Sequence, residues 1–326
     1  MKTLTDTIYG KIKQASGLLF GTIFIFIALS ILAEGFLSTY NCLNILKDFS
    51  ILLIISLGMT LTILLGKLDM SVGSVMSLSG IVTTLLIANH AGLVLSIAGG
   101  LASGLIIGLI NGYFVGVQKF DYFIVTFASL SIAKGLAQVI CNGNIISCES
   151  SAFGYLGSGK LLGVYLIIWI AIIIFFISYF VTKKTSFGYK LYSVGGSEAV
   201  SSLSAIKSKR IYVTAFAVCG LMAAVSGILL AARAYSGNAT AGAGYEFNAI
   251  AAVLVGGTPF DGGKGGVKGT FLGALFITIL KNGLNLLGFS SPLQYTLIGL
   301  IILIAIVADV FIDERKKIND LRRVEL

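Results

Sequence analysis

The chain has 326 residues, of which 56% are hydrophobic and only 11% are charged. Soluble domains carry about 25% charged residues, so the composition excludes an ordinary soluble protein and predicts a polytopic membrane protein in a lipid bilayer. The formal net charge is +9, but the charges cluster between apolar windows. They therefore point to membrane topology and anionic lipid headgroups, and no nucleic-acid partner is expected. The four cysteines and the single histidine show no metal-ligand spacing, so we expect no metal and no cofactor.

Apolar windows separated by charges or turn residues predict an all-α fold with about ten transmembrane helices in one domain over residues 1–326. Most of the windows approach the roughly 20 apolar residues that a helix needs to cross a bilayer. The predicted spans are 17–37, 46–65, 72–88, 93–115, 122–141, 161–182, 211–232, 245–257, 268–288 and 293–312. The window 245–257 is short and flanked by glycines, which indicates a broken or re-entrant segment.

Lys and Arg residues predict the orientation of these spans. Ten crossings that start in the cytoplasm place the N-terminus, the 66–69 turn, the 183–210 loop and the 313–326 tail on the same side. Most of the 23 basic residues then lie in cytoplasmic segments, as the positive-inside rule requires. We therefore expect both termini to be cytoplasmic.

Two glycine-rich segments share a pattern that suggests an internal repeat. Ser103–Val117 and Gly269–Phe289 both carry an Asn-Gly pair, at Asn111 and at Asn282. If the two segments are equivalent, spans two to five and seven to ten form an inverted repeat, an architecture common in transporters. Chance similarity between glycine-rich membrane helices is the alternative.

Two polar motifs interrupt the apolar pattern. Asp69 lies in the first, just before the third span, where it would cap the helix or contact a substrate; we favour the cap. Glu246 lies in the second, at the edge of the short span, where a lone charge needs a partner or water. Polar residues within spans tend to face cavities, although packing between helices would explain them equally well. The further candidates for a translocation path are Ser71, Ser74, Asn111, Lys134, Gln138, Asn282 and Asn285.

Nothing in the sequence predicts ATP hydrolysis or other catalysis by this chain. Lys264 follows a glycine as in a phosphate-binding loop, but Thr258 stands where that loop needs glycine and Gly265 where it needs Ser or Thr. Energy for active transport would then come from another protein. The long polar interruption Lys183–Arg210, between two uncharged windows, is the candidate attachment point.

Taken together, four motifs resemble those of the inner-membrane permeases of bacterial ABC importers for monosaccharides, the ribose, xylose, allose and autoinducer-2 group. The motifs are Leu68–Ser74, Gly244–Ala252, Gly256–Gly265 and Gly283–Gly288. The resemblance implies a multi-pass protein of the bacterial cytoplasmic membrane that works by alternating access. It also implies two cytoplasmic ABC ATPase subunits, a second copy of a permease and an extracytoplasmic sugar-binding protein as partners.

The resemblance further implies that Gly195–Ile206 is a coupling helix that docks on the ATPase. Ser197 would cap this helix and Glu198 would favour its first turn. Leu203 and Ile206, three residues apart, would present one apolar face. The expected coupling residues are Gly195, Gly196, Ser197, Glu198, Ser201, Leu203, Ala205 and Ile206. Relatives usually carry glycine where Ala205 stands and an Ala-Ala pair near Val200 and Ser201.

Three alternatives stay open at this point. The solute could be a nucleoside or autoinducer-2 instead of a common monosaccharide. The chain could be an ATP-independent secondary transporter, which is disfavoured because Asp69, Glu246 and Asp309 all lie near span edges. A structural or assembly protein of the membrane would not need the glycine-rich loops or a coupling helix.

Overall fold

The computed structural model describes residues 2–305 and 307, and most of them lie in helices. The helices are α1 Lys2–Leu32, α2 Thr39–Leu64, α3 Val72–Ala88, α4 Leu93–Gly116, α5 Tyr122–Ile140, α6 Ser151–Ser158, α7 Leu166–Lys184, α8 Ser186–Gly196, α9 Glu198–Leu203, α10 Ser208–Ala234, α11 Tyr245–Val255 and α12 Val267–Leu286. A further apolar helix covers Ser291–Ala305. The strands are two antiparallel pairs of two-residue segments: β1 Ile146–Ser147 with β4 Ser236–Gly237, and β2 Lys160–Leu161 with β3 Val164–Tyr165. The prediction of an all-α polytopic membrane protein is confirmed.

The apolar helices correspond to the ten predicted windows. Among the described residues, six helices are long and apolar enough to cross a membrane: α2, α4, α5, α7, α10 and α12. Four shorter apolar helices are Gly17–Leu32, α3, α11 and Ser291–Ala305. The predicted window 161–182 begins too early, because residues 160–165 form the β2–β3 hairpin. Asp309 and the 313–326 tail lie outside the described residues.

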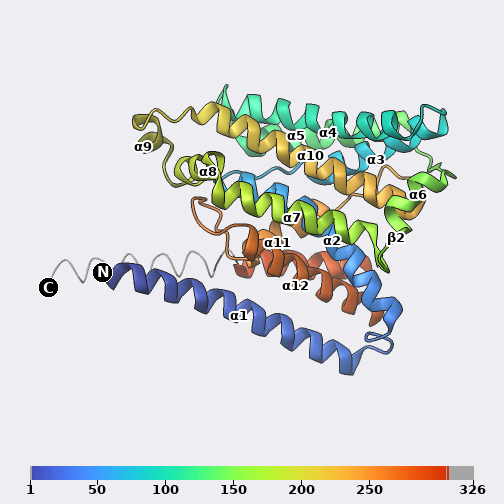
Figure 1. The fold of residues 1–326 in the computed structure, drawn as a ribbon, viewed down its shortest axis with the longest axis horizontal. Helices are drawn as coiled ribbons and strands as arrows, with labels where there is room; N and C mark the ends of the chain where they lie inside the picture. Colours follow the sequence, from blue (N-terminus) through green and yellow to red (C-terminus); the bar gives the residue numbers. More distant parts are fainter. Residues whose placement is uncertain (1, 306, 308–326) are drawn as a thin grey trace.

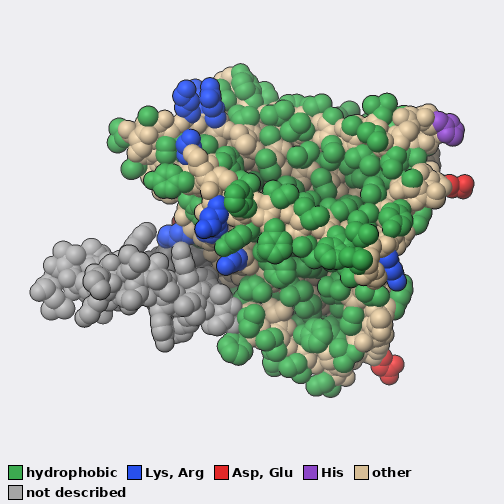
Figure 2. All heavy atoms as spheres, viewed as in Figure 1, with side chains coloured by type: hydrophobic (Ala, Val, Ile, Leu, Met, Phe, Trp, Pro, Cys, Tyr) green, Lys and Arg blue, Asp and Glu red, His purple; other side chains and the backbone are tan. Residues whose placement is uncertain are grey.

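The helices run side by side, with distinct structures at the two ends of the molecule. Figure 1 places α8, α9 and the start of α1 at one end, and α6 and β2 at the other. Figure 2 shows Lys and Arg side chains gathered at the α8–α9 end, while hydrophobic side chains cover much of the surface between the ends. This distribution is that of a membrane protein whose apolar belt faces lipid.

The core is built around α2 and α10, most of whose residues are buried. Close contact between α4 and α10 depends on glycines that recur every fourth residue on one face of α4, at positions 100, 104, 108, 112 and 116. A Cβ atom at Gly104 would lie 2.4 Å from the Gly220 carbonyl oxygen, and one at Gly108 would lie 2.4 Å from the Phe216 carbonyl oxygen. Small residues let membrane helices approach in this way.

The packing partners of the helices follow a two-fold pattern. α4 packs on α10 as α12 packs on α2, and α3 packs on α4 as α11 packs on α12. Exchanging α2, α3 and α4 with α10, α11 and α12 therefore reproduces the same neighbours. An inverted repeat would give this arrangement, so the pattern supports that hypothesis.

Candidate functional site

A buried polar cluster lies where the α2–α3 connection meets α4 and α5. The Asp69 Oδ1 atom accepts hydrogen bonds from the Ser71 backbone N–H at 3.0 Å and from the Ser71 hydroxyl at 2.5 Å. Asn111 of α4 donates from Nδ2 to Ser71 Oγ at 3.0 Å and to Asp69 Oδ1 at 3.3 Å. On its other side, the Asn111 Oδ1 atom accepts from the Ser129 hydroxyl of α5 at 2.5 Å. The sequence predicted three members of this cluster but did not predict that they would meet.

Asp69 lies just ahead of α3 and is 1% exposed. Its bond to the Ser71 N–H satisfies one of the backbone donors that a helix start leaves free. No Lys or Arg pairs with it within residues 2–305. The carboxylate is held by neutral donors near the positive end of α3, but Ser71 is the N-cap residue of that helix and no described side chain bonds to the N–H groups inside its first turn, so Asp69 supports the helix start without being its N-cap.

Glu246 occupies a related position at the first turn of the 11-residue α11. Its Oε1 atom accepts from the Gly244 N–H at 3.2 Å, and the residue is 8% exposed. Gly73 in the first turn of α3 makes room for it, because a Cβ at Gly73 would lie 2.0 Å from Glu246 Oε2. Both predicted carboxylates thus lie near the N-terminal ends of α3 and α11. Both are buried in the protein and not exposed to water at the edge of a span.

The other predicted path residues are scattered. Ser74 is half-buried in α3, and Lys134 and Gln138 are exposed on α5. Asn282 exchanges two hydrogen bonds with Asn41 of α2, at 2.9 and 3.0 Å, so it joins α12 to α2. Asn285 is exposed near the end of α12. The structure therefore brings Asp69, Ser71 and Asn111 together and does not bring the remaining candidates to the same place.

The predicted coupling segment forms two helices. Gly195 and Gly196 end α8, and Ser197 caps the six-residue α9 by accepting the Val200 N–H at 3.3 Å. Glu198 lies in the first turn of α9 and pairs with Lys119 of the α4–α5 connection. The cap and the first-turn acid agree with the sequence prediction.

The prediction that Leu203 and Ile206 share one apolar face is wrong. α9 ends at Leu203, and Ala205 beyond it has a left-handed φ of 58°. This turn sends Ile206 back to pack on the core cluster that contains Ile211. Leu203 is left 88% exposed, with Val200 62% exposed and Ser201 buried. Glycine, which the resemblance implies at position 205, would suit this backbone, because glycine adopts positive φ without strain.

A compact junction connects α8 with the loops of the membrane core. The Gly263 N–H donates to the Leu64 carbonyl at the end of α2, at 2.9 Å. The Tyr192 hydroxyl of α8 donates to the Gly265 carbonyl at 2.9 Å. A Cβ at Gly195 would lie 1.8 Å from the Leu64 oxygen, so glycine is needed at this approach. Movement of α8 would therefore reach the connection between α11 and α12 directly.

Several polar residues whose partners lie on other helices could not be recognised from the sequence. Ser129 and Ser77 sit in apolar windows and Asn41 lies just before one. Only the fold shows that their partners are Asn111, the Gly242 N–H and Asn282, respectively. Through the part of the chain that the structure describes, no three or more His, Cys, Asp or Glu side chains gather as a metal site requires.

Comparison with known proteins covers most of the chain. The family described as "Branched-chain amino acid transport system / permease component" matches residues 41–306. The ribose import permease protein RbsC of Escherichia coli (strain K12) is 38% identical over 284 residues, which cover 86% of this chain and 88% of the relative. RbsC of Bacillus subtilis (strain 168) is 38% identical over 303 residues, covering 92% of this chain and 94% of the relative. The L-arabinose ABC transporter permease protein AraH of Azospirillum brasilense is 31% identical over 299 residues, covering 92% and 88%. No solved structure matches the chain.

Proposed function

The chain belongs to the family of branched-chain amino acid transport system permease components, and from this premise we propose that it carries a monosaccharide through the membrane for an ATP-driven ABC importer. Similarity to ribose and L-arabinose permeases over most of the chain supports a sugar as the solute. Residues 1–326 would act as one transmembrane domain.

One observation supports the assignment of an ATP-driven partner: α8 and α9 lie at one end of the molecule, and apolar side chains of α9 are exposed there among the described residues. Leu203 and Val200 are exposed on α9, and basic side chains gather around this end. An exposed leucine and valine on a short capped helix suit docking in a groove of a soluble protein. Two cytoplasmic ABC ATPase subunits would fill this role for a pair of permeases, with an extracytoplasmic sugar-binding protein at the opposite end.

The mechanism proposed is alternating access in the bacterial cytoplasmic membrane, with both termini in the cytoplasm. Closure of the ATPases on ATP would move α8 and α9 as a rigid unit. The bonds Gly263–Leu64 and Tyr192–Gly265 would transmit this movement to α2 and to the α11–α12 connection. ATP hydrolysis would take place on the partner, and this chain would supply the path. A ligand shifts such an equilibrium only by its differential affinity for the two states, so a weak polar site suffices.

The test is sugar uptake by proteoliposomes that contain the permease, its ATPase and its binding protein. Uptake of labelled ribose or L-arabinose should require both the ATPase and ATP. Uptake that persists without either would support the ATP-independent alternative and overturn the proposal. Competition by a nucleoside or autoinducer-2, with no competition by sugars, would instead select the alternative solute.

A further inference from the structure

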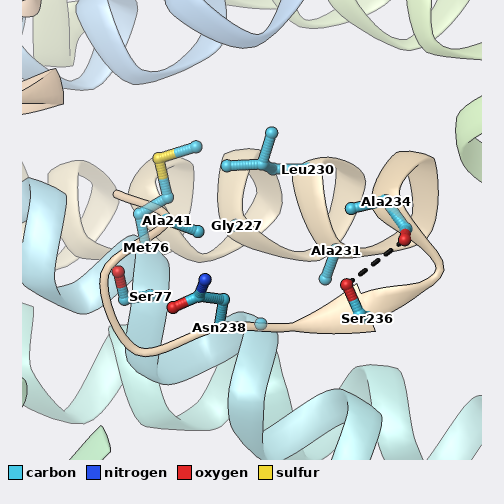
Figure 3. A pocket seen from close by; sticks show the side chains of 10 residues that line it. Met76, Ser77, Gly227, Leu230, Ala231, Ala234, Ser236, Asn238 and Ala241 are labelled. Carbon is cyan, nitrogen blue, oxygen red and sulfur yellow. Dashed lines mark hydrogen bonds between the residues drawn. The ribbon is translucent and has the colours of Figure 1, made fainter. Parts of the chain in front are cut away.

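A cavity of about 220 Å³ lies between α3, α10 and the segment 236–241. Figure 3 shows Asn238 and Ser236 on this segment facing Ser77 of α3 and the end of α10. The cavity is lined by Met76, Ser77, Gly80, Gly227, Leu230, Ala231, Ala234, Ser236, Asn238 and Ala241. This space has room for several water molecules, which is the scale of a small solute.

The segment that covers the cavity is held against α3 at both of its ends. A Cβ at Gly237 would lie 2.2 Å from Thr84 Oγ1, and one at Gly242 would lie 2.0 Å from the Gly73 carbonyl oxygen. These two glycines bring the chain down onto α3 on either side of the cavity. The Gly242 N–H also donates to Ser77 Oγ at 2.8 Å. Residues 238–241 therefore arch over the space between two close contacts.

The polar groups around the cavity keep free hydrogen-bonding capacity. Asn238 Oδ1 accepts from the Thr240 N–H and hydroxyl, both at 2.9 Å, which fixes the carboxamide. In the described chain its Nδ2 has no acceptor, and the Ser77 hydroxyl accepts from Gly242 without donating to any group. Ser236 Oγ donates to the Ala234 carbonyl at 3.2 Å and keeps its lone pairs free. The lining thus offers two donors and an acceptor.

The remaining lining is apolar and uncharged. Met76, Leu230 and Ala231 form a hydrophobic wall, and among the described residues no Asp, Glu, Lys or Arg lines the cavity. A zwitterionic amino acid would lose hydration of two charges there without compensation, which is costly. A polyol both donates and accepts hydrogen bonds and has apolar C–H faces. We propose that this cavity is a transit site for a neutral monosaccharide; the proposal rests on the importer function proposed above.

The position of the cavity suits the entry side. α10 begins beside α9 and ends at Ala234, so its last turns lie at the end of the molecule away from the ATPase-docking element. Sugar released by a binding protein would meet this cavity before it reached the Asp69 cluster deeper in the fold.

The first experiment fills the cavity. Ala241 is exposed at its mouth and Ala243, two residues on, is exposed but does not line it. In proteoliposomes with the ATPase and binding protein, Ala241→Trp should lower uptake of ribose or L-arabinose at least about tenfold, while Ala243→Trp should transport like the wild type. Both variants should co-purify with the ATPase. Normal uptake by Ala241→Trp would overturn the transit site.

The second experiment removes the Asn238 Nδ2 donor and measures whether sugar occupies the cavity. Asn238→Asp keeps the oxygen that Thr240 requires but replaces the free Nδ2 donor with an oxygen. It should weaken sugar uptake about tenfold, because it removes a hydrogen-bond donor and places a charge in a lining that is otherwise uncharged. In an Ala241→Cys complex, millimolar ribose should slow labelling by a maleimide, and labelling at an unchanged rate would contradict the proposal. If the wild-type complex takes up no sugar at all, the proposed importer function is overturned. If the wild type takes up sugar and the cavity variants take it up equally well, only the transit site is overturned.

Discussion

At the scale of single residues, Asp69 is a central acceptor of the buried polar cluster. Replacing it with alanine leaves the buried Ser71 hydroxyl and N–H without their acceptor, while the Asn111 amide keeps only its bond to Ser71 Oγ. Each unsatisfied buried group costs about 1–3 kcal/mol. We therefore expect Asp69→Ala to lower the thermal unfolding midpoint of the purified protein in detergent markedly, and Asp69→Asn to do so less, because an amide oxygen can still accept.

Asp121 provides the matched control for this prediction. It caps α5 by accepting from the Phe123 N–H at 2.8 Å, but it is exposed to the surroundings. Loss of an exposed cap costs only about 1 kcal/mol, since water replaces the side chain. Equal losses for Asp69→Ala and Asp121→Ala would contradict a special role for the buried cluster.

Contacts between residues close in the sequence could be predicted, whereas contacts between different helices could not. The bond from Ser71 to Asp69 spans two residues, so the sequence motif alone indicated a helix start. Asn111 and Ser129 are hydrogen-bonded only because α4 packs on α5, and no local sequence pattern predicts such a pair. Asn282 is an intramembrane amide, which favours a place on the path, but its partner Asn41 is 241 residues away. A polar residue within a span predicts that a hydrogen-bond partner exists, but the sequence does not identify that partner.

At the scale of elements, the α4–α10 contact depends on the missing Cβ of Gly108. Gly108→Ala would place a methyl carbon 2.4 Å from the Phe216 carbonyl oxygen, so the backbones must separate. Overpacking of this kind costs about 1–3 kcal/mol. A Cβ added at Gly135 of α5 would have nothing within 4 Å, and alanine is the better helix former there. Unfolding in detergent should show Gly108→Ala less stable and Gly135→Ala no less stable than wild type; equal behaviour would contradict the packing argument.

The α9 element gives a prediction about the partner. Leu203→Asp places a charge on an 88% exposed side chain at the proposed docking surface. Desolvating that charge in an apolar groove is unfavourable, so co-purification of the ATPase should fall at least about tenfold while membrane insertion stays normal. Leu162 in the β2–β3 turn is 87% exposed at the opposite end, and Leu162→Asp should leave co-purification unchanged. An intact ATPase complex with Leu203→Asp would place the docking surface elsewhere.

Element boundaries were harder to predict than the elements. The ten apolar windows were visible because membrane helices need long runs of apolar residues. The end of α9 depends on one backbone angle at Ala205, a residue that rarely adopts positive φ, so the sequence suggested a longer helix. The β2–β3 hairpin likewise shortened a window whose residues are apolar throughout.

At the scale of the whole molecule, the two ends should lie on opposite sides of the membrane. Lys183, Lys184, Lys207, Lys209 and Arg210 flank α8 and α9. At the other end the structure pairs Arg233 with Asp48. The positive-inside rule therefore predicts that the α8–α9 end faces the cytoplasm.

Leu203→Cys and Leu162→Cys test this orientation with the same residue pair that tests docking. Cys141, Cys148 and Cys219 are buried and Cys42 is half-buried, so a Cys42→Ser background leaves little native reactivity in the described chain. In intact cells stripped of any outer barrier, a membrane-impermeant maleimide should label Leu162→Cys and spare Leu203→Cys. Permeabilising the cytoplasmic membrane should then expose Leu203→Cys, unless a bound ATPase covers it, and stripping the ATPase should restore labelling. Labelling of Leu203→Cys in intact cells would reverse the orientation, and with it the assignment of α9 to a cytoplasmic partner and of the Asn238 cavity to the entry side.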